Sequence, residues 1–201
     1  MIAAFYILIV LFSVVIHEVS HGFMANILGD PTAKMQGRLT LNPVKHLDLF
    51  GSIILPAVLY FTGAPVLGWA KPVPFNPYNL KAGKWGPALV AVVGPVSNLL
   101  VAIFFSVMIR LNLEFAFAST VFNQLCLLVV SLNVILAIFN LIPIPPLDGS
   151  KVLFATLPYK LRHIETFLEQ YGFFLIIFFL LFGASIILPI QQFLVSLLVG
   201  I

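Results

Sequence analysis

The sequence is poor in charged residues, which make up 8% of its 201 positions, and it contains only one cysteine. Soluble globular domains carry about a quarter of their residues as charged side chains, so this composition excludes an ordinary soluble domain. Ten basic residues against seven acidic ones leave a net charge of +3. The basic residues lie in short loops, which fits control of membrane topology better than nucleic-acid binding. The lone Cys126 cannot form a disulfide within the chain and is expected to be a buried apolar residue.

Hydrophobic residues make up 61% of the chain, and they gather in long runs that predict membrane-spanning helices. Each run is near the roughly 20 residues that a helix needs to cross a bilayer. The four runs are residues 2–28, 87–110, 121–142 and 166–188. A shorter apolar tail after Pro189, over residues 190–201, is expected to form a partial span or an interfacial helix. We therefore expect an all-α polytopic membrane protein with about four to six transmembrane helices.

The region after the first helix is interrupted by glycines and prolines, so its apolar run over residues 49–68 has two interpretations. Basic residues flank this run on both sides, and a full crossing would place equal positive charge on both faces of the membrane. A re-entrant run would keep residues 29–85 on the cytoplasmic side, and we favour it over a full extra span. The neighbouring stretches 36–44 and 66–78 contain prolines and alternating residues, which predict short β-strands and turns.

The most informative motif is His-Glu-Val-Ser-His at residues 17–21, inside the first apolar run. A helix brings positions i and i+4 onto one face, so His17 and His21 can direct imidazole nitrogens at one zinc ion. Glu18 can then act as a general base on a water molecule at the metal. At 1.5 Å per residue, His21 lies roughly 12 Å from a helix end near Gly29, below the membrane surface. The motif predicts metal-dependent hydrolysis inside the membrane.

Catalytic zinc usually has three protein ligands, and the best candidate for the third is Asp148. This residue follows the proline-rich stretch 140–147, where prolines break the helix at the edge of an apolar segment. Taken alone, Asp148 could equally serve as the N-cap of a helix over residues 149–157. Beside a two-histidine motif that lacks a third ligand, metal binding is favoured over capping.

Three motifs occur in an order that resembles the site-2 protease family of intramembrane metalloproteases. They are HEVSH at 17–21, GPVSN at 94–98, and an asparagine followed by Pro-Pro-Leu-Asp-Gly within 140–149. The stretches 37–48 and 68–77 look like the small prokaryotic branch of that family, which has neither PDZ nor CBS domains. The resemblance implies hydrolysis of a peptide bond within the transmembrane segment of a membrane protein substrate.

The resemblance also implies a set of site residues and a cofactor. One zinc ion per chain would be bound by His17, His21 and Asp148, with Glu18 as the general base. Asn140 matches an asparagine thought to help hold the substrate near the metal. The protein would lie in a prokaryotic plasma membrane, with its active site nearer the cytoplasmic face.

The other small or polar residues of the motifs are expected to support this site. Gly94 and Pro95 should let two helices approach closely, with Asn98 forming a hydrogen bond across the interface. Asn140 has two interpretations. It could form an interhelical hydrogen bond, or it could donate to the scissile carbonyl. We favour donation, because the proline-broken segment that carries Asp148 follows Asn140. His46 lies in a polar loop and is expected to serve a turn or to support the ligands.

We expect a single membrane-embedded domain over residues 1–201, with a catalytic core over about 1–157 and C-terminal helices over 166–201. The predicted activity is that of a zinc metalloendopeptidase. Its partners would be a transmembrane protein substrate and the lipid bilayer, with no nucleic acid. A transporter for metal ions or protons is the alternative, because such pathways also use intramembrane His, Glu and Asp residues. The chain lacks the repeated halves common among transporters, which counts against that alternative.

Overall fold

The computed structural model describes residues 2–63, 68–116 and 118–200, and within these ranges every regular element is a helix or a helical turn. Four helices are long and apolar enough to cross a membrane. They are α1 (Ile2–Ile27), α4 (Gly86–Phe115), α5 (Thr120–Asn140) and α7 (Arg162–Phe182). The all-α class and the four predicted spans are confirmed, and the chain is an integral membrane protein.

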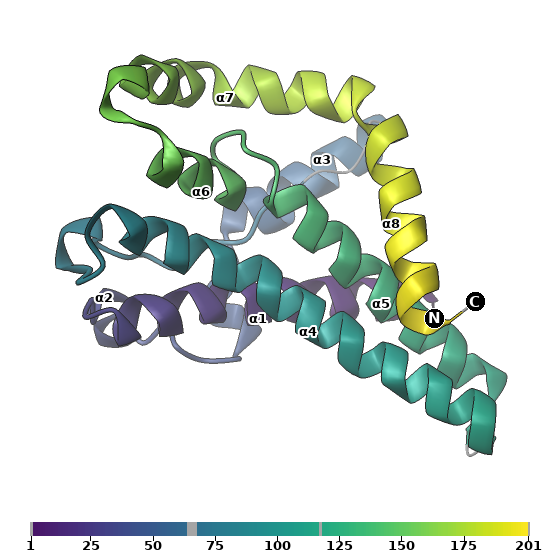
Figure 1. Ribbon diagram of the computed structural model, residues 1–201. Coiled ribbons are helices and arrows are strands. Elements are labelled where there is room, and N and C mark those ends of the chain that lie inside the picture. Colours follow the sequence, from purple (N-terminus) through teal and green to yellow (C-terminus); the bar gives the residue numbers. More distant parts are fainter. Residues whose placement is uncertain (1, 64–67, 117, 201) are drawn as a thin grey trace.

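The core of the fold is a bundle in which α4 packs against both α1 and α5, and α8 (Ala184–Val199) covers α4 and α5 (Figure 1). Small and β-branched side chains fill the contact between α4, α5 and α8, which lets these helices approach closely. The buried residues of this contact are Ala102, Ile109, Cys126, Val130, Val134, Val195 and Val199. Cys126 is therefore a buried apolar residue, as expected.

The shorter elements connect the bundle helices. They are α2 (Thr32–Met35), α6 (Asp148–Thr156) and the 3₁₀ turns η1 (Pro43–His46), η3 (Pro77–Asn79), η4 (Gly83–Trp85) and η5 (Tyr159–Leu161). Figure 1 shows α7 at the top, far from α1, while α6 lies between α7 and α4. Most of the side chains of α7 are exposed, which suits a helix that faces lipid.

The fourth apolar run ends earlier than we expected. The sequence predicts a break at Pro189, but the chain turns at Gly183 and Pro189 lies inside α8. A proline removes only one hydrogen bond from a helix, and membrane helices tolerate it where local adjustments satisfy the freed groups. The carbonyl of Gly183 accepts from the N–H groups of Ile186 and Ile187, which starts the new helix.

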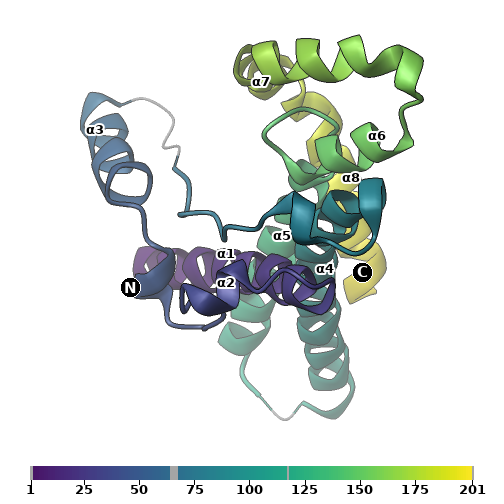
Figure 2. The same cartoon turned by 90° about the vertical axis from the view of Figure 1, so that its left-hand side faces the viewer.

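The interrupted run after the first helix forms two short helical segments. They are a π-helical segment, η2 (Leu49–Ile54), and α3 (Leu55–Thr62). At about 1.5 Å per residue the pair measures roughly 21 Å, less than the ~30 Å of a bilayer core. Figure 2 shows α3 standing apart from α1, α4 and α5. Re-entry of this segment stays a prediction, and residues 64–67 of the predicted run lie outside the described residues.

The prediction of β-strands was wrong for all described residues of 36–44 and 66–78, since none of them is in a strand. Residues 66 and 67 lie outside the described part of the chain. The first stretch forms turns that lead into η1. Residues 68–76 run as an extended segment beside α1 instead of joining a sheet.

Prolines explain why this extended segment does not pair as a strand. Pro72 and Pro74 have no N–H group to donate to a ladder. Instead, every second N–H group of the segment donates to a different part of the chain. The N–H of Trp69 donates to the carbonyl of Gly51, and the N–H of Lys71 donates to the carbonyl of His46. The N–H of Val73 donates to the carboxylate of Glu18. The segment is thus held along α1 by individual contacts.

Candidate metal centre

Three side chains from two helices converge inside the bundle. His17 and His21 lie one turn apart on α1, and Asp148 is the first residue of α6. The Oδ2 atom of Asp148 lies 3.0 Å from Nε2 of His17 and 3.3 Å from Nε2 of His21. Tetrahedral ligands about 2.0–2.1 Å from zinc lie about 3.3 Å from one another, so this spacing fits a single small cation.

Hydrogen bonds on the far side of each imidazole decide which ring nitrogen is free. Nδ1 of His21 lies 2.7 Å from the carbonyl oxygen of Val90. A carbonyl only accepts, so Nδ1 donates and Nε2 of the neutral ring presents a lone pair. Nδ1 of His17 lies 2.6 Å from Oδ1 of Asn98, which favours the same tautomer. Both free nitrogens therefore face Asp148.

The third group at this point is also an acceptor. Oδ2 of Asp148 is buried and has no hydrogen-bond donor among the described residues. Two imidazole lone pairs and a carboxylate oxygen so close together repel one another unless a cation lies between them. The three possible ligand atoms lie within 4.8 Å of one another. Two histidines with a carboxylate are a common ligand set for catalytic zinc. The residues present therefore fit a divalent metal such as zinc.

The position of Asp148 depends on a close contact between the end of α5 and the start of α6. A Cβ atom added at Gly149 would collide with the backbone of Leu141 and Ile142. Glycine therefore lets the first turn of α6 lie directly on the loop that follows α5. The carboxylate of Asp148 does not cap α6, whose N-cap residue is Leu147. It faces the two histidines instead.

Helix α4 passes directly beside the two imidazoles at Gly94. A Cβ atom at this position would lie 2.5 Å from Nε2 of His21 and 2.7 Å from Cε1 of His17. Pro95 is fully buried next to it. Only a glycine leaves room here for the two histidines and the helix together.

Glu18 lies one residue beyond His17 and is held by the extended segment. Its Oε2 atom accepts a hydrogen bond of 2.7 Å from the backbone N–H of Val73. Val73 is buried against α1, so this carboxylate is fixed at the edge of the metal group. A carboxylate in this position is suited to accept a proton from a water molecule bound nearby.

Two residues anchor the extended segment on either side of Val73. Asp30, fully buried at the end of α1, accepts hydrogen bonds from Thr32, Asn76 and Asn79. Burial alone would raise the pKa of Asp30, but these donors outweigh it and hold the pKa below its ordinary value. The guanidinium of Arg38 donates to the carbonyl oxygens of Lys45, Lys71 and Pro72.

Two sequence-predicted residues do not belong to the metal group. Nδ2 of Asn140 donates to the carbonyl of Leu136 at 2.9 Å, within its own helix. His46 is buried in the loop after α2, where its Nε2 lies 2.9 Å from the carbonyl of Thr40. Asn98, in contrast, contacts the ring of His17 directly. Gly94 lies against both imidazoles, and Pro95 is buried next to it.

Sequence reasoning missed Ser13 and Asn133, two polar residues that lie behind His17. Nδ2 of Asn98 donates to Oδ1 of Asn133 at 2.8 Å, and Nδ2 of Asn133 donates to Oγ of Ser13 at 2.9 Å. All three side chains are buried. The available signal was the occurrence of isolated polar residues within long apolar runs, where polar groups usually bond to a neighbouring helix.

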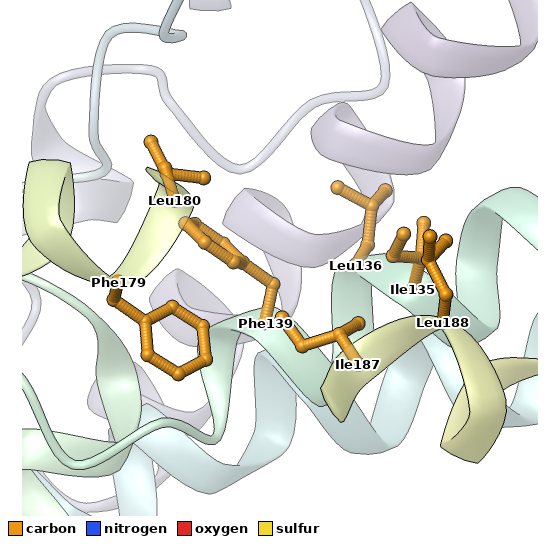
Figure 3. A pocket seen from close by; sticks show the side chains of 7 residues that line it. All are labelled: Ile135, Leu136, Phe139, Phe179, Leu180, Ile187 and Leu188. Atoms are coloured by element: carbon orange, nitrogen blue, oxygen red, sulfur yellow. The ribbon is translucent and has the colours of Figure 1, made fainter. Parts of the chain in front are cut away.

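A separate cavity of about 350 Å³ lies between α5, α7 and α8 (Figure 3). The side chains that line it are all apolar: Ile135, Leu136, Phe139, Phe179, Leu180, Ile187 and Leu188. It offers no acid, base or metal ligand from its side chains. The group around His17 is therefore the candidate site for chemistry.

Comparisons with known proteins identify relatives among zinc metalloproteases. Residues 108–183 match Peptidase family M50. The chain is 39% identical over 185 residues to "Putative zinc metalloprotease YwhC" of Bacillus subtilis (strain 168), which covers 88% of this chain and 81% of that protein. It is 29% identical over 174 residues to "Putative zinc metalloprotease Rip2" of Mycolicibacterium smegmatis, which covers 85% of this chain and 64% of that protein. No solved structure matches the chain significantly. The chain therefore belongs to peptidase family M50, the site-2 protease family of zinc metalloproteases.

Proposed function

We propose that this protein is an intramembrane endopeptidase that hydrolyses a peptide bond within the transmembrane segment of a membrane protein substrate. One zinc ion per chain is bound by His17, His21 and Asp148, and Glu18 is the general base. The observation that carries the proposal is the approach of three buried acceptor atoms within the helical bundle. Oδ2 of Asp148 lies 3.0 Å from Nε2 of His17 and 3.3 Å from Nε2 of His21.

The depth of the site supports cleavage within the membrane. His21 lies roughly 9 Å from the end of α1 at Ile27, at 1.5 Å per residue. Most of the surrounding residues of α1 are apolar, which supports a position of the ligands inside the hydrocarbon layer. Basic residues in the loop after α1 favour a cytoplasmic location for that end of the helix. We therefore place the site nearer the cytoplasmic face of a prokaryotic plasma membrane.

Zinc, when bound, polarises a carbonyl group and lowers the pKa of a water ligand toward ~7. The carboxylate of Glu18 then accepts a proton from the attacking water and passes it to the leaving amine. The N–H of Val73 holds this carboxylate in place during both transfers. Burial of the ligands within the bundle strengthens each of these electrostatic interactions.

Asn140 is the proposed contact to the substrate backbone. An amide nitrogen carries two hydrogens, and the carbonyl of Leu136 accepts one of them. The other can donate to a carbonyl oxygen of an extended substrate. This role requires no loss of the existing hydrogen bond to Leu136, which supports the interpretation made from the sequence.

We propose that the chain acts as one domain, with its catalytic core over about residues 1–157. All the proposed ligands, the base and the substrate contact lie within that range. Helices α7 and α8 carry none of them. Helix α8 covers α4 and α5, and α7 packs against α8.

The test is cleavage of a model transmembrane substrate in liposomes that contain the purified protein and zinc. Glu18→Gln should lower the cleavage rate by at least about 10²-fold, since it removes the general base, while zinc remains bound. Glu114→Gln, at an exposed position near the end of α4, is the matched control and should cleave like the wild type. Wild-type cleavage by Glu18→Gln would contradict the proposal, and zinc flux without cleavage would favour a transporter.

A further inference from the structure

Behind His17, three polar side chains from three different helices form a continuous chain of hydrogen bonds. Ser13 comes from α1, Asn98 from α4 and Asn133 from α5. Their exposed fractions are 3%, 0% and 0%, so each is sealed from solvent and lipid. Buried polar groups are costly unless they are bonded, and a fully bonded network fixes the arrangement of its members.

Two backbone carbonyls set the orientation of the asparagine amides in this hydrogen-bond network. Nδ2 of Asn133 lies 2.9 Å from the carbonyl oxygen of Val129, and Nδ2 of Asn98 lies 3.3 Å from that of Ser13. A carbonyl only accepts, so the amide nitrogens must face these oxygens. The amide oxygen of Asn133 then faces Asn98.

The orientation of Asn98 in turn determines the tautomer of His17. With its nitrogen turned toward Ser13 and Asn133, Asn98 presents its oxygen to Nδ1 of His17. That nitrogen must therefore carry the proton, which leaves the lone pair on Nε2, the atom nearest Asp148. The contact from Asn98 to Asn133 is 2.8 Å, shorter than its 3.3 Å contact to Ser13, so Asn133 is the stronger anchor.

We propose that Asn133 is a positioning residue of the zinc site, which acts through Asn98 to hold His17 in the metal-binding tautomer. The inference rests on the proposed function of His17 as a ligand. Without the oxygen of Asn133, the amide of Asn98 keeps only its longer contact to the carbonyl of Ser13, so it can turn and donate to Nδ1 of His17. That exchange places the ring proton on Nε2, where it blocks a metal.

The test is the zinc affinity of the purified full chain, measured by competition with a chelator, for the wild type and Asn133→Leu. We expect zinc binding at least about 10-fold weaker in Asn133→Leu, the scale of effect seen for groups that orient metal ligands. Asn133→Ala serves as a second variant, read in the same way, if leucine prevents folding.

Asn112→Leu is the matched control, because it also removes a buried asparagine from the contact between α4 and α5. Asn112 bonds to Ala118 and Asn123, and it lies roughly 21 Å along α4 from Asn98. This variant should lose thermal stability and keep wild-type zinc affinity. An equal loss of zinc affinity in Asn112→Leu and Asn133→Leu would overturn the inference, since it would show a general structural effect.

A rescue variant separates positioning from packing. Asn98→Asp offers an acceptor oxygen to His17 whichever way it turns, so the double variant Asn98→Asp/Asn133→Leu should regain zinc affinity relative to Asn133→Leu. Wild-type affinity in Asn133→Leu, or no recovery in the double variant, would overturn the inference and leave the proposed ligands intact. Absence of zinc binding by the wild type would instead defeat the proposed function itself.

Discussion

The carboxylate of Glu18 accepts a hydrogen bond of 2.7 Å from the backbone N–H of Val73, a residue 55 positions further along the chain. Val73 stands between Pro72 and Pro74, neither of which has an N–H group. Its N–H is therefore the sole backbone donor of that tripeptide. A proline on each side also favours extended backbone, so Pro-Val-Pro presents one fixed donor to the proposed general base.

Val73→Pro should therefore lower the rate of peptide hydrolysis at saturating substrate while zinc affinity stays unchanged. A hydrogen bond to a charged group contributes about 1.5–3 kcal/mol, which corresponds to a loss of roughly 10-fold or more in rate. Val73→Ala is the control, because it shortens the side chain and keeps the N–H. Equal rates in the two variants would show that this hydrogen bond does not hold the base.

Gly94→Ala should weaken zinc binding at least about 10-fold and abolish most activity, because the new methyl group would lie 2.5 Å from Nε2 of His21. The measurement is zinc affinity by chelator competition. Gly86→Ala, in the first turn of the same helix, is the matched control. Its methyl group would crowd Leu80, so it strains the same helix roughly 12 Å from Gly94, away from the two histidines. Unchanged zinc affinity in Gly94→Ala would mean that α4 does not lie as close to the ligands as described.

Arg110→Met should lower the stability of the fold without changing zinc affinity. The guanidinium of Arg110 donates to the carbonyl oxygens of Leu197 and Leu198, each at 2.7 Å, and so joins α4 to the last turn of α8. A cation at a helix C-terminus contributes about 0.3–1 kcal/mol at an exposed site. Thermal unfolding should detect this loss. A drop in zinc affinity of the same variant would show that α8 influences the metal site.

Acid should weaken the anchor at Asp30. Its pKa is below the ordinary value of 3.8 in the folded chain, so its contribution to stability is fully present above that value and is lost as pH falls through the lower folded pKa. Asp30→Asn removes this contribution. The difference in thermal stability between wild type and Asp30→Asn should be largest near neutral pH and shrink in strong acid. A difference that grows as pH falls would contradict the hydrogen bonding described for Asp30.

The features that sequence could predict are those encoded by neighbouring residues. The apolar runs predicted the four long helices, because length and hydropathy alone determine which segments suit a bilayer. The i, i+4 spacing of His17 and His21 likewise requires only a helix. The proline-broken apolar setting of Asp148 predicts a third ligand, and the structure brings its carboxylate to the two histidines.

Features that depend on distant segments were beyond the sequence patterns. Asn133 meets Asn98 only because α4 and α5 pack in one particular register, which no local periodicity encodes. The extended segment over residues 68–76 has the composition of a strand, but its partners are scattered donors and acceptors and not another strand. Pro189 does not break the helix, because the turn at Gly183 already separates α7 from α8.

The most direct test of the metal centre is the zinc content of the purified wild type beside His17→Ala and Asp148→Ala, with His163→Ala as a control at an exposed histidine of α7. The account predicts one zinc ion per chain in the wild type and in His163→Ala, and loss of tightly bound zinc in the other two variants. One tightly bound zinc ion per chain in Asp148→Ala, at wild-type affinity, would contradict it.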